Sequence, residues 1–183
     1  MRRQIFFSIL LVFSITVAYG QSASNEIAFT FNDTNYFINN LKIDKKTSID
    51  SIEKQLGKPQ RIKKSEKYNI KTKETHYWRY YFFDKLGISV MFHLNDSTIK
   101  MISFFYKNID KRSTKKRFTG HIIINGKEIF QSDSYSILMQ KFPEFNVELV
   151  LFGSIAGMTI SKRAYFVVFF DEGYGISKFE WTF

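Results

Sequence analysis

Three histidines and a few carboxylates are the residues of this 183-residue chain whose types suit acid–base or metal chemistry. His76, His93 and His121 are far apart in sequence, and none has another histidine or a carboxylate at the spacing of a metal-binding motif. His93 alternates with apolar residues, so its side chain is predicted to face solvent. The chain has no cysteine, which excludes thiolate chemistry. We therefore predict no catalytic residue, no metal site and no cofactor.

Acidic residues near the C-terminus leave one enzymatic alternative open. Asp171 and Glu172 lie in a predicted turn, where acidic residues are common. Glu180 lies between Phe179 and Trp181, on the opposite face of their strand. Paired carboxylates can hydrolyse a glycosidic bond. The alternative function is therefore a hydrolase of envelope polymers that uses these acidic residues.

Basic and aromatic residues are the candidates for partner binding. The net charge is +10, and lysine and arginine are concentrated in residues 58–73 and 107–117, both predicted to be exposed loops. Residues 75–83 form a predicted strand that is bulky on both faces, so its second face is either covered by the rest of the chain or exposed to a ligand. The alternative role of the basic loops is solubility alone. The candidate partner-binding residues are Lys63, Lys64, Lys67, Lys115, Lys116, Trp78 and Tyr80.

The first 20 residues have the pattern of a cleavable signal peptide. Arg2 and Arg3 precede an apolar run over residues 5–18, and small residues follow at Ala18 and Gly20. That run is about 14 residues long, whereas a membrane-spanning helix needs about 20. Without cysteine, an acylated lipoprotein is excluded. We therefore predict a periplasmic or extracellular protein that meets the membrane only through this segment, and a nucleic-acid partner is not expected.

Composition and turn residues predict an α+β fold. Phe and Tyr together number 31, which favours strands and supplies the core that disulfides cannot stabilise. One helix is predicted within residues 47–57, capped by Thr47 or Ser48, and a second helix runs through Lys141 from a cap at Ser132 or Ser134. Residues 153–158 fit either a bulged strand or a loop. The remaining predicted strands cover residues 27–31, 36–38, 41–43, 88–94, 99–106, 122–124, 127–130, 147–152, 165–170 and 176–183.

The order of these elements repeats along the chain. Residues 38–43 (INNLKI) match 124–129 (INGKEI) at an offset of 86, which extends to the later helix positions. Near the ends of the two halves the offset becomes 77, with Phe104 matching Trp181. We therefore predict a tandem duplication of a unit with a β-hairpin, one short helix and an antiparallel β-meander. The predicted divisions are residues 1–20 (signal peptide), 21–110 (repeat 1), 111–117 (basic linker) and 118–183 (repeat 2).

This pattern resembles uncharacterised exported proteins of Bacteroidota type, over residues 38–106 and 124–183. The arrangement of a short helix followed by a β-meander, twice in tandem, is also similar at the level of the fold to the β-lactamase inhibitor protein and to small outer-membrane-assembly lipoproteins. These resemblances imply protein–protein binding, although this chain lacks the cysteines of both families. We therefore predict an exported, non-enzymatic binding protein of the envelope that recognises an acidic protein or an anionic envelope surface. A toxin-neutralising role is a further alternative.

Overall fold

The computed structural model describes residues 27–107, 113–150, 155–161, 164–173 and 175–183. Thirteen strands and two helices are assigned in this part of the chain, so the fold is α+β with most residues in strands. The predicted signal peptide lies outside the described residues, as does the start of the predicted linker. None of the helices in the described ranges is long and apolar enough to span a membrane.

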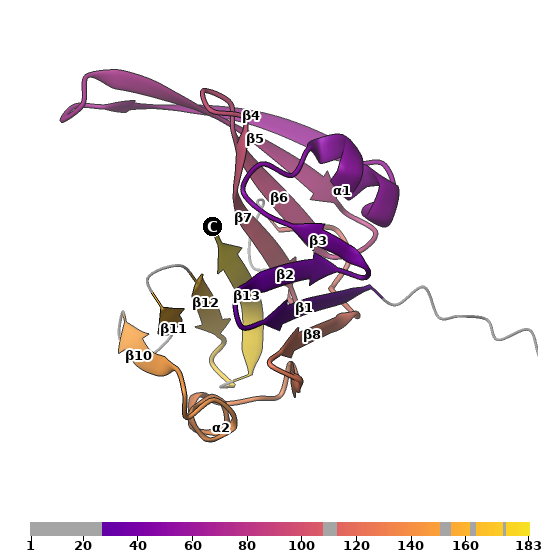
Figure 1. Cartoon of the computed structure of the whole chain (residues 1–183), viewed down its shortest axis with the longest axis vertical. Coiled ribbons are helices and arrows are strands. Elements are labelled where there is room, and N and C mark those ends of the chain that lie inside the picture. Colours follow the sequence, from indigo (N-terminus) through magenta and orange to yellow (C-terminus); the bar gives the residue numbers. More distant parts are fainter. Residues whose placement is uncertain (1–26, 108–112, 151–154, 162–163, 174) are drawn as a thin grey trace, which may run out of the picture.

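Eight strands form a large antiparallel sheet in the order β10-β11-β12-β13-β7-β6-β5-β4 (Figure 1). Aromatic and β-branched residues recur along the central strands, and most residues of these strands are buried. Each half of the chain contributes four consecutive strands, and the halves meet where β13 pairs with β7. The strands are β4 (Arg61–Asn69), β5 (Glu74–Phe83), β6 (Ile88–His93), β7 (Thr98–Phe105), β10 (Asn146–Val150), β11 (Ile155–Ser161), β12 (Ala164–Phe170) and β13 (Ile176–Thr182).

Five short strands form a second sheet in the order β3-β2-β1-β8-β9. Hairpins β2–β3 and β8–β9 turn at Asn39 and Asn125, whose positive φ angles of 52° and 47° suit tight turns. Strand β1 lies between the two hairpins, antiparallel to β2 and parallel to β8. The strands are β1 (Ala28–Asn32), β2 (Asn35–Ile38), β3 (Leu41–Ile43), β8 (His121–Ile124) and β9 (Lys127–Ile129).

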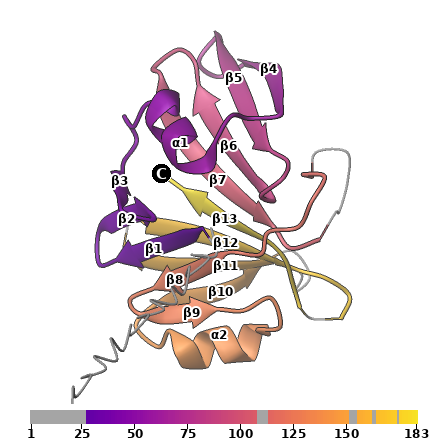
Figure 2. The same cartoon turned by 90° about the vertical axis from the view of Figure 1, so that its right-hand side faces the viewer.

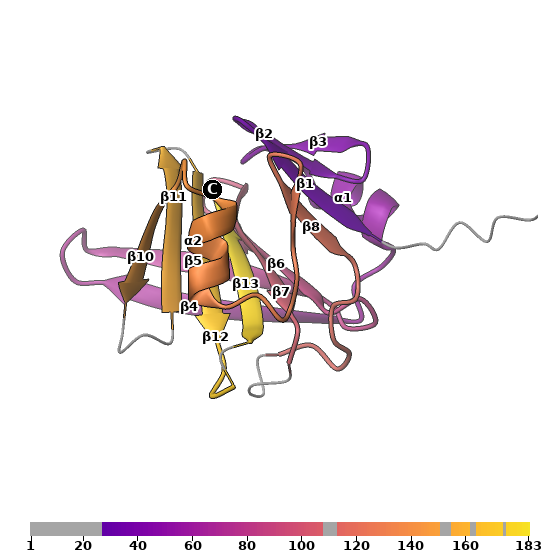
Figure 3. The same ribbon diagram turned by 90° about the horizontal axis from the view of Figure 1, so that it is seen from below.

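Two short helices flank the small sheet. Helix α1 (Ile49–Leu56) is capped by Ser48, whose hydroxyl accepts a hydrogen bond from the amide of Ser51. Helix α2 (Tyr135–Lys141) is capped by Ser134 in the same way. Figure 2 shows one continuous layer that runs from α1 through β3, β2, β1, β8 and β9 to α2. Seen from below in Figure 3, strands β1, β2 and β8 lie on one side of β6 and β7.

The core lies between this layer and the large sheet. Phe29 of the small sheet packs edge-on against Phe104 of the large sheet, with ring centroids 4.3 Å apart. Tyr36 packs against Trp181 at the same separation. These rings are buried, and burial of each large apolar side chain contributes about 1.5–3 kcal/mol. The opposite, outer face of the large sheet is not covered by any described helix or strand.

The same order of elements occurs in both halves of the chain. A hairpin, a helix and four antiparallel strands follow one another from β2 to β7 and again from β8 to β13. Ser103 lies opposite Glu180 where the two halves pair, and Ile102 and Phe104 lie opposite Trp181 and Phe179. The last strands of the two halves, β7 and β13, therefore pair antiparallel about a local twofold axis that passes between Ser103 and Glu180.

The structure contradicts one sequence-based prediction and decides between two alternatives at another place. Residues 58–73 were predicted to be a loop, but most of them form strand β4 and its turn. Nearly all of β4 is exposed, so it lacks the buried alternation by which a strand is recognised. Residues 153–158, for which a strand and a loop both fitted, enter strand β11 at Ile155.

Candidate functional site

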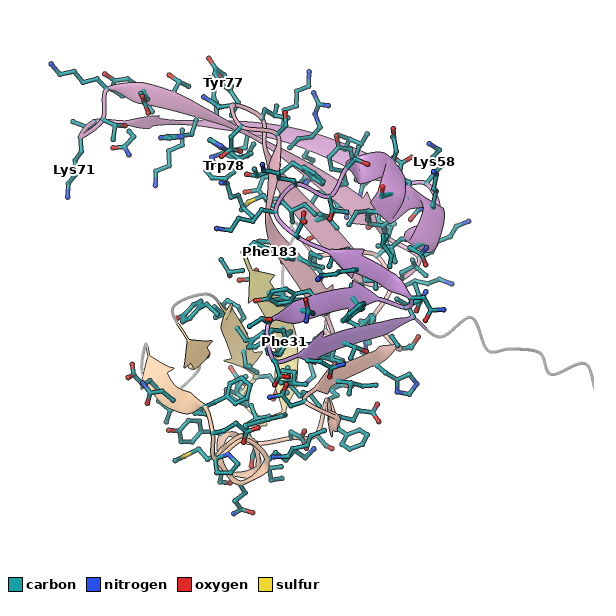
Figure 4. All side chains as sticks on the ribbon, in the orientation of Figure 1. Phe31, Lys58, Lys71, Tyr77, Trp78 and Phe183 are labelled. Carbon is teal, nitrogen blue, oxygen red and sulfur yellow. The ribbon has the colours of Figure 1, made fainter. Side chains whose placement is uncertain are left out.

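The β4–β5 hairpin projects from the body of the molecule (Figure 1). Every residue from Ile62 to Tyr68 is exposed, and Ile70 in the turn is 82% exposed. In Figure 4 Lys71 marks the tip of the hairpin, far from the core residue Phe31. The distal half of the hairpin therefore adds surface to the molecule without adding to its core.

Strand pairing decides which predicted binding residues share a face. Lys63 lies opposite Tyr80, and Lys67 lies opposite His76, two residues before Trp78. These five residues occupy the outer face of the sheet because Tyr81 and Phe83, which alternate with them, are buried in the core. Trp78 and Tyr80 are half-buried, so the second face of β5 is neither covered by another layer nor fully exposed. Lysine heads and aromatic rings thus lie together on this face.

Lys64 points to the other side of the hairpin, opposite Arg79. Tyr77 and Trp78 show the same division in Figure 4, where they lie on opposite sides of the ribbon. A partner that follows the outer edge of β4 meets lysines from both faces, because side chains alternate along a strand. The edge, rather than either face alone, therefore brings Lys63, Lys64 and Lys67 together.

The remaining predicted residues, Lys115 and Lys116, lie at the root of the hairpin. The Asp84 carboxylate accepts a hydrogen bond from the amide of Lys115 at 3.0 Å, and the Asp84 carbonyl accepts one from the amide of Lys116. Both lysine side chains are exposed. Because Asp84 directly follows β5, these backbone contacts place both lysines at the base of the hairpin rather than at its tip.

A partly buried ion pair between Arg61 and Asp84 stabilises the root of the hairpin. Arg61 donates from Nε and a terminal nitrogen to the two oxygens of Asp84, at 2.5 and 2.6 Å. Arg61 also donates to the carbonyl of Ser113 and lies over the ring of Phe82. The Arg61 guanidinium holds the pKa of Asp84 below its usual value. These contacts join β4, the end of β5 and the basic connector into one support for the hairpin.

Two histidines meet on the outer face, an arrangement that the sequence analysis missed. His76 Nδ1 lies 3.0 Å from His93 Nε2, and the Trp78 ring packs 4.5 Å from the His93 ring. His93 was predicted to face solvent, but it is only 8% exposed because these two neighbours cover it. The turn after β5 is the sequence feature from which the contact between the two histidines could have been predicted. A hairpin centred on that turn places Trp78 opposite His93 and His76 diagonally beside it.

The acidic residues of the hydrolase alternative lie in different settings. Glu180 lies within β13, where it accepts a hydrogen bond from Ser103 and pairs with Lys178. Asp171 lies in the turn before β13 and forms an ion pair with Lys107. That turn borders a cavity of about 390 Å³, lined by Lys107, Gln131, Ser132, Asp171, Gly173 and Gly175. Asp171 is the single carboxylate among these lining residues.

Comparisons with known proteins give a family but no activity. No curated protein matches the chain, and no solved structure matches it. A protein-family model described as a domain of unknown function matches residues 28–139, which extend from β1 to helix α2 and include the whole β4–β5 hairpin. The chain therefore belongs to the family named domain of unknown function DUF7738.

Proposed function

We propose that this protein is an exported, non-enzymatic binding protein of the cell envelope that captures an acidic protein on its β4–β5 hairpin. The observation that carries the proposal is the projection of a lysine-rich, exposed hairpin outside the core. A segment of that size contributes little to folding, since stability comes mainly from burial. Contact with a partner gives the segment a role.

The charge on the hairpin is the first support. Lys64, Lys67, Lys71 and Lys73 are exposed, and no carboxylate in the described part of the chain lies within ion-pair distance of them. Residues 61–74 contain six basic residues against Glu66 and Glu74, and such an excess of one charge attracts partners of the opposite sign and speeds their association at low salt. An acidic partner therefore matches this surface.

The open edge of β4 is the second support. β4 ends the large sheet, so its outer side has no neighbouring strand among the described elements. Edge strands accept a further extended segment through backbone hydrogen bonds. A second copy of β4 would bring lysines against lysines, whereas an acidic segment would neutralise them. An extended acidic peptide therefore fits this edge better than a lipid surface, which offers no backbone partner.

The outer face beside this edge adds apolar contact. Trp78 and Tyr80 are half-buried there, close to the lysines of β4. Tyrosine and tryptophan contribute strongly to protein interfaces because they combine large apolar area with a polar group. Protein–protein binding is also what the resemblance to the β-lactamase inhibitor protein implies.

A matched pair of charge-reversal variants tests the proposal. The hairpin variant carries Lys→Glu at Lys64, Lys67, Lys71 and Lys73. The control variant carries four Lys→Glu changes at exposed positions away from the hairpin, namely Lys42, Lys45, Lys46 and Lys54. Binding of a fluorescent extended peptide rich in Glu and Thr is followed by anisotropy at 20 and 200 mM salt, and vesicles containing phosphatidylglycerol serve as the lipid probe.

Wild type and the control variant should bind the acidic peptide, more weakly at high salt, and the hairpin variant should lose at least tenfold in affinity. Equal binding by both variants would show that only overall charge matters and would overturn the proposal. Binding to vesicles without binding to peptide would replace the acidic protein with an anionic envelope surface. Hydrolysis of envelope polymers that depends on Asp171, Glu172 or Glu180 would favour the enzymatic alternative.

The proposal includes export through residues 1–20 and a tandem duplication as the origin of the fold. Support for the duplication comes from matched positions in the two halves. Ser48 and Ser134, 86 residues apart, cap the two helices, and Ile52 and Leu138 at the same offset are both fully buried. In β12 the match is shifted by one residue. The offset of 77 pairs Val90 with Val167, but the buried valine of β12 that corresponds to the buried Val90 is Val168.

A further inference from the structure

We propose that His76 and His93 form a binding site for a divalent transition-metal ion, copper or zinc, on the outer face of the large sheet. This site adjoins the acidic-partner edge, because His76 lies opposite Lys67 of β4, but the inference does not depend on the proposed function. It rests on the distance between the two ring nitrogens, the position of Asp96 behind His93, and the access that His76 leaves to solvent.

The distance between the nitrogens suits chelation. His76 Nδ1 and His93 Nε2 lie 3.0 Å apart. Two nitrogens that share a tetrahedral zinc ion with Zn–N bonds of about 2.05 Å lie about 3.3 Å apart. A small movement of the half-exposed His76 ring therefore converts the contact between the two histidines into a metal site. The metal would replace the proton that one ring otherwise donates to the other.

Asp96 is placed as the outer partner of a metal-binding histidine. Its Oδ1 lies 3.0 Å from His93 Nδ1, on the far side of the ring from Nε2. His93 Nδ1 is buried and makes no well-aligned hydrogen bond with the described residues, so this carboxylate is the acceptor at hand. A carboxylate there keeps the proton on Nδ1 and leaves the Nε2 lone pair for a metal, as at many zinc sites.

The Asp96 carboxylate is itself held in place. Its Oδ2 accepts a hydrogen bond from Lys100 Nζ at 2.9 Å, and its Oδ1 accepts one from the Thr98 hydroxyl at 2.5 Å. These contacts hold the carboxylate in its position behind His93.

The surroundings select the kind of ion. Imidazole nitrogens suit copper, zinc and nickel, whereas magnesium and calcium prefer oxygen. No group of three or more histidine, cysteine or acidic side chains placed to hold a metal occurs within the described ranges, so water completes the coordination. His76 is half-exposed, which leaves room for that water. The Trp78 ring screens the other side of His93.

Metal titration of the tag-free protein tests the site, with Cu²⁺ and Zn²⁺ as probes and Mg²⁺ as the negative control. Calorimetry should give one equivalent of Cu²⁺, and of Zn²⁺ more weakly. Cu²⁺ should also quench the fluorescence of Trp78, which packs against His93, while the buried Trp181 provides a reference signal. Trp78→Phe should abolish most of the quenching and leave the calorimetric binding in place.

Single variants identify the ligands. His76→Gln and His93→Gln should each weaken binding of Cu²⁺ at least tenfold, and His121→Gln, which changes the remaining histidine, should not. Circular dichroism shows whether each variant is folded, and the half-exposed His76 gives a result even if His93→Gln unfolds the protein. Unchanged binding in a folded His76→Gln variant, or no binding of either metal by wild type at 100 µM, would overturn the proposal.

Discussion

The Ser103 hydroxyl donates a buried hydrogen bond of 3.0 Å to Glu180 Oε1, and this contact lies where the two halves of the large sheet meet. Both residues are at least 90% buried, on the face of the sheet away from the core. On one side of this pair Ile102 faces Trp181, and on the other Phe104 faces Phe179. Besides the backbone pairing of β7 with β13, this seam therefore has a polar side-chain contact on the outer face and two apolar pairs on the core face.

A double-mutant cycle over Ser103→Ala and Glu180→Ala should show a coupling energy of about 1 kcal/mol, the usual value of a buried hydrogen bond. Urea unfolding of the two single variants and the double variant measures it. Glu172→Ala, in an exposed turn, is the control and should change stability by less than about 0.5 kcal/mol. Strict additivity of the two single changes would show that the contact contributes nothing.

Gly87 and Gly57 form a matched pair for glycine substitution. Their φ angles are +73° and +77°, so alanine is strained at both positions, by about 1–3 kcal/mol. A Cβ atom at Gly87 would lie 2.1 Å from the amide nitrogen of Phe118. A Cβ atom at Gly57 would have no atom of any non-adjacent residue within 4 Å. Gly87→Ala should therefore cost several times as much as Gly57→Ala, or prevent folding, as thermal unfolding would show. Equal costs would mean that the connector before Phe118 moves away freely.

Acid should weaken the support of the hairpin through Asp84. Its pKa in the folded protein is below that of an unfolded aspartate, about 3.9, so the ion pair with Arg61 stabilises the fold fully above that value. That contribution is lost as the pH falls through the lowered pKa. Asp84→Asn should cost about 2–3 kcal/mol at pH 7 and progressively less below pH 4. Urea unfolding at several pH values measures the difference, and a penalty independent of pH would contradict this account.

The two serine caps should be equivalent in their effect. Each hydroxyl accepts a hydrogen bond from an amide three residues later, at Ser51 or Ile137. Ser48→Ala and Ser134→Ala should each cost about 1 kcal/mol. Thermal unfolding checks this, with Gln140→Ala, at an exposed position within α2, as the control. A loss confined to one half would show that the two caps are not equivalent.

Local features of the sequence predicted the helices and the small hairpins. The Asn39 and Asn125 turns and the serine caps act within a few residues, so they can be recognised without knowledge of the fold. Strand β4 was missed because it has no buried face and therefore no apolar alternation. Its conformation comes from pairing with β5, which is a tertiary effect.

The candidate sites were predictable only in part. Exposed lysines on residues 58–73 could be identified from composition, but their place on a sheet edge could not. The meeting of His76 and His93 follows from the register of one hairpin, whereas each histidine was first considered alone. The contact between Arg61 and Asp84 joins the start of β4 to the end of β5, so it depends on the pairing that the sequence did not show.

The position of β1 has a consequence for the order in which the chain completes its fold. β1 is the first strand of the described chain, yet its parallel neighbour β8 is made only after the whole first half. Until residues 121–124 arrive, one side of β1 has no backbone partner and Phe29 and Phe31 lack part of their packing. Chains that end before residue 121 would therefore expose an unpaired strand edge and apolar side chains, which proteases and chaperones recognise.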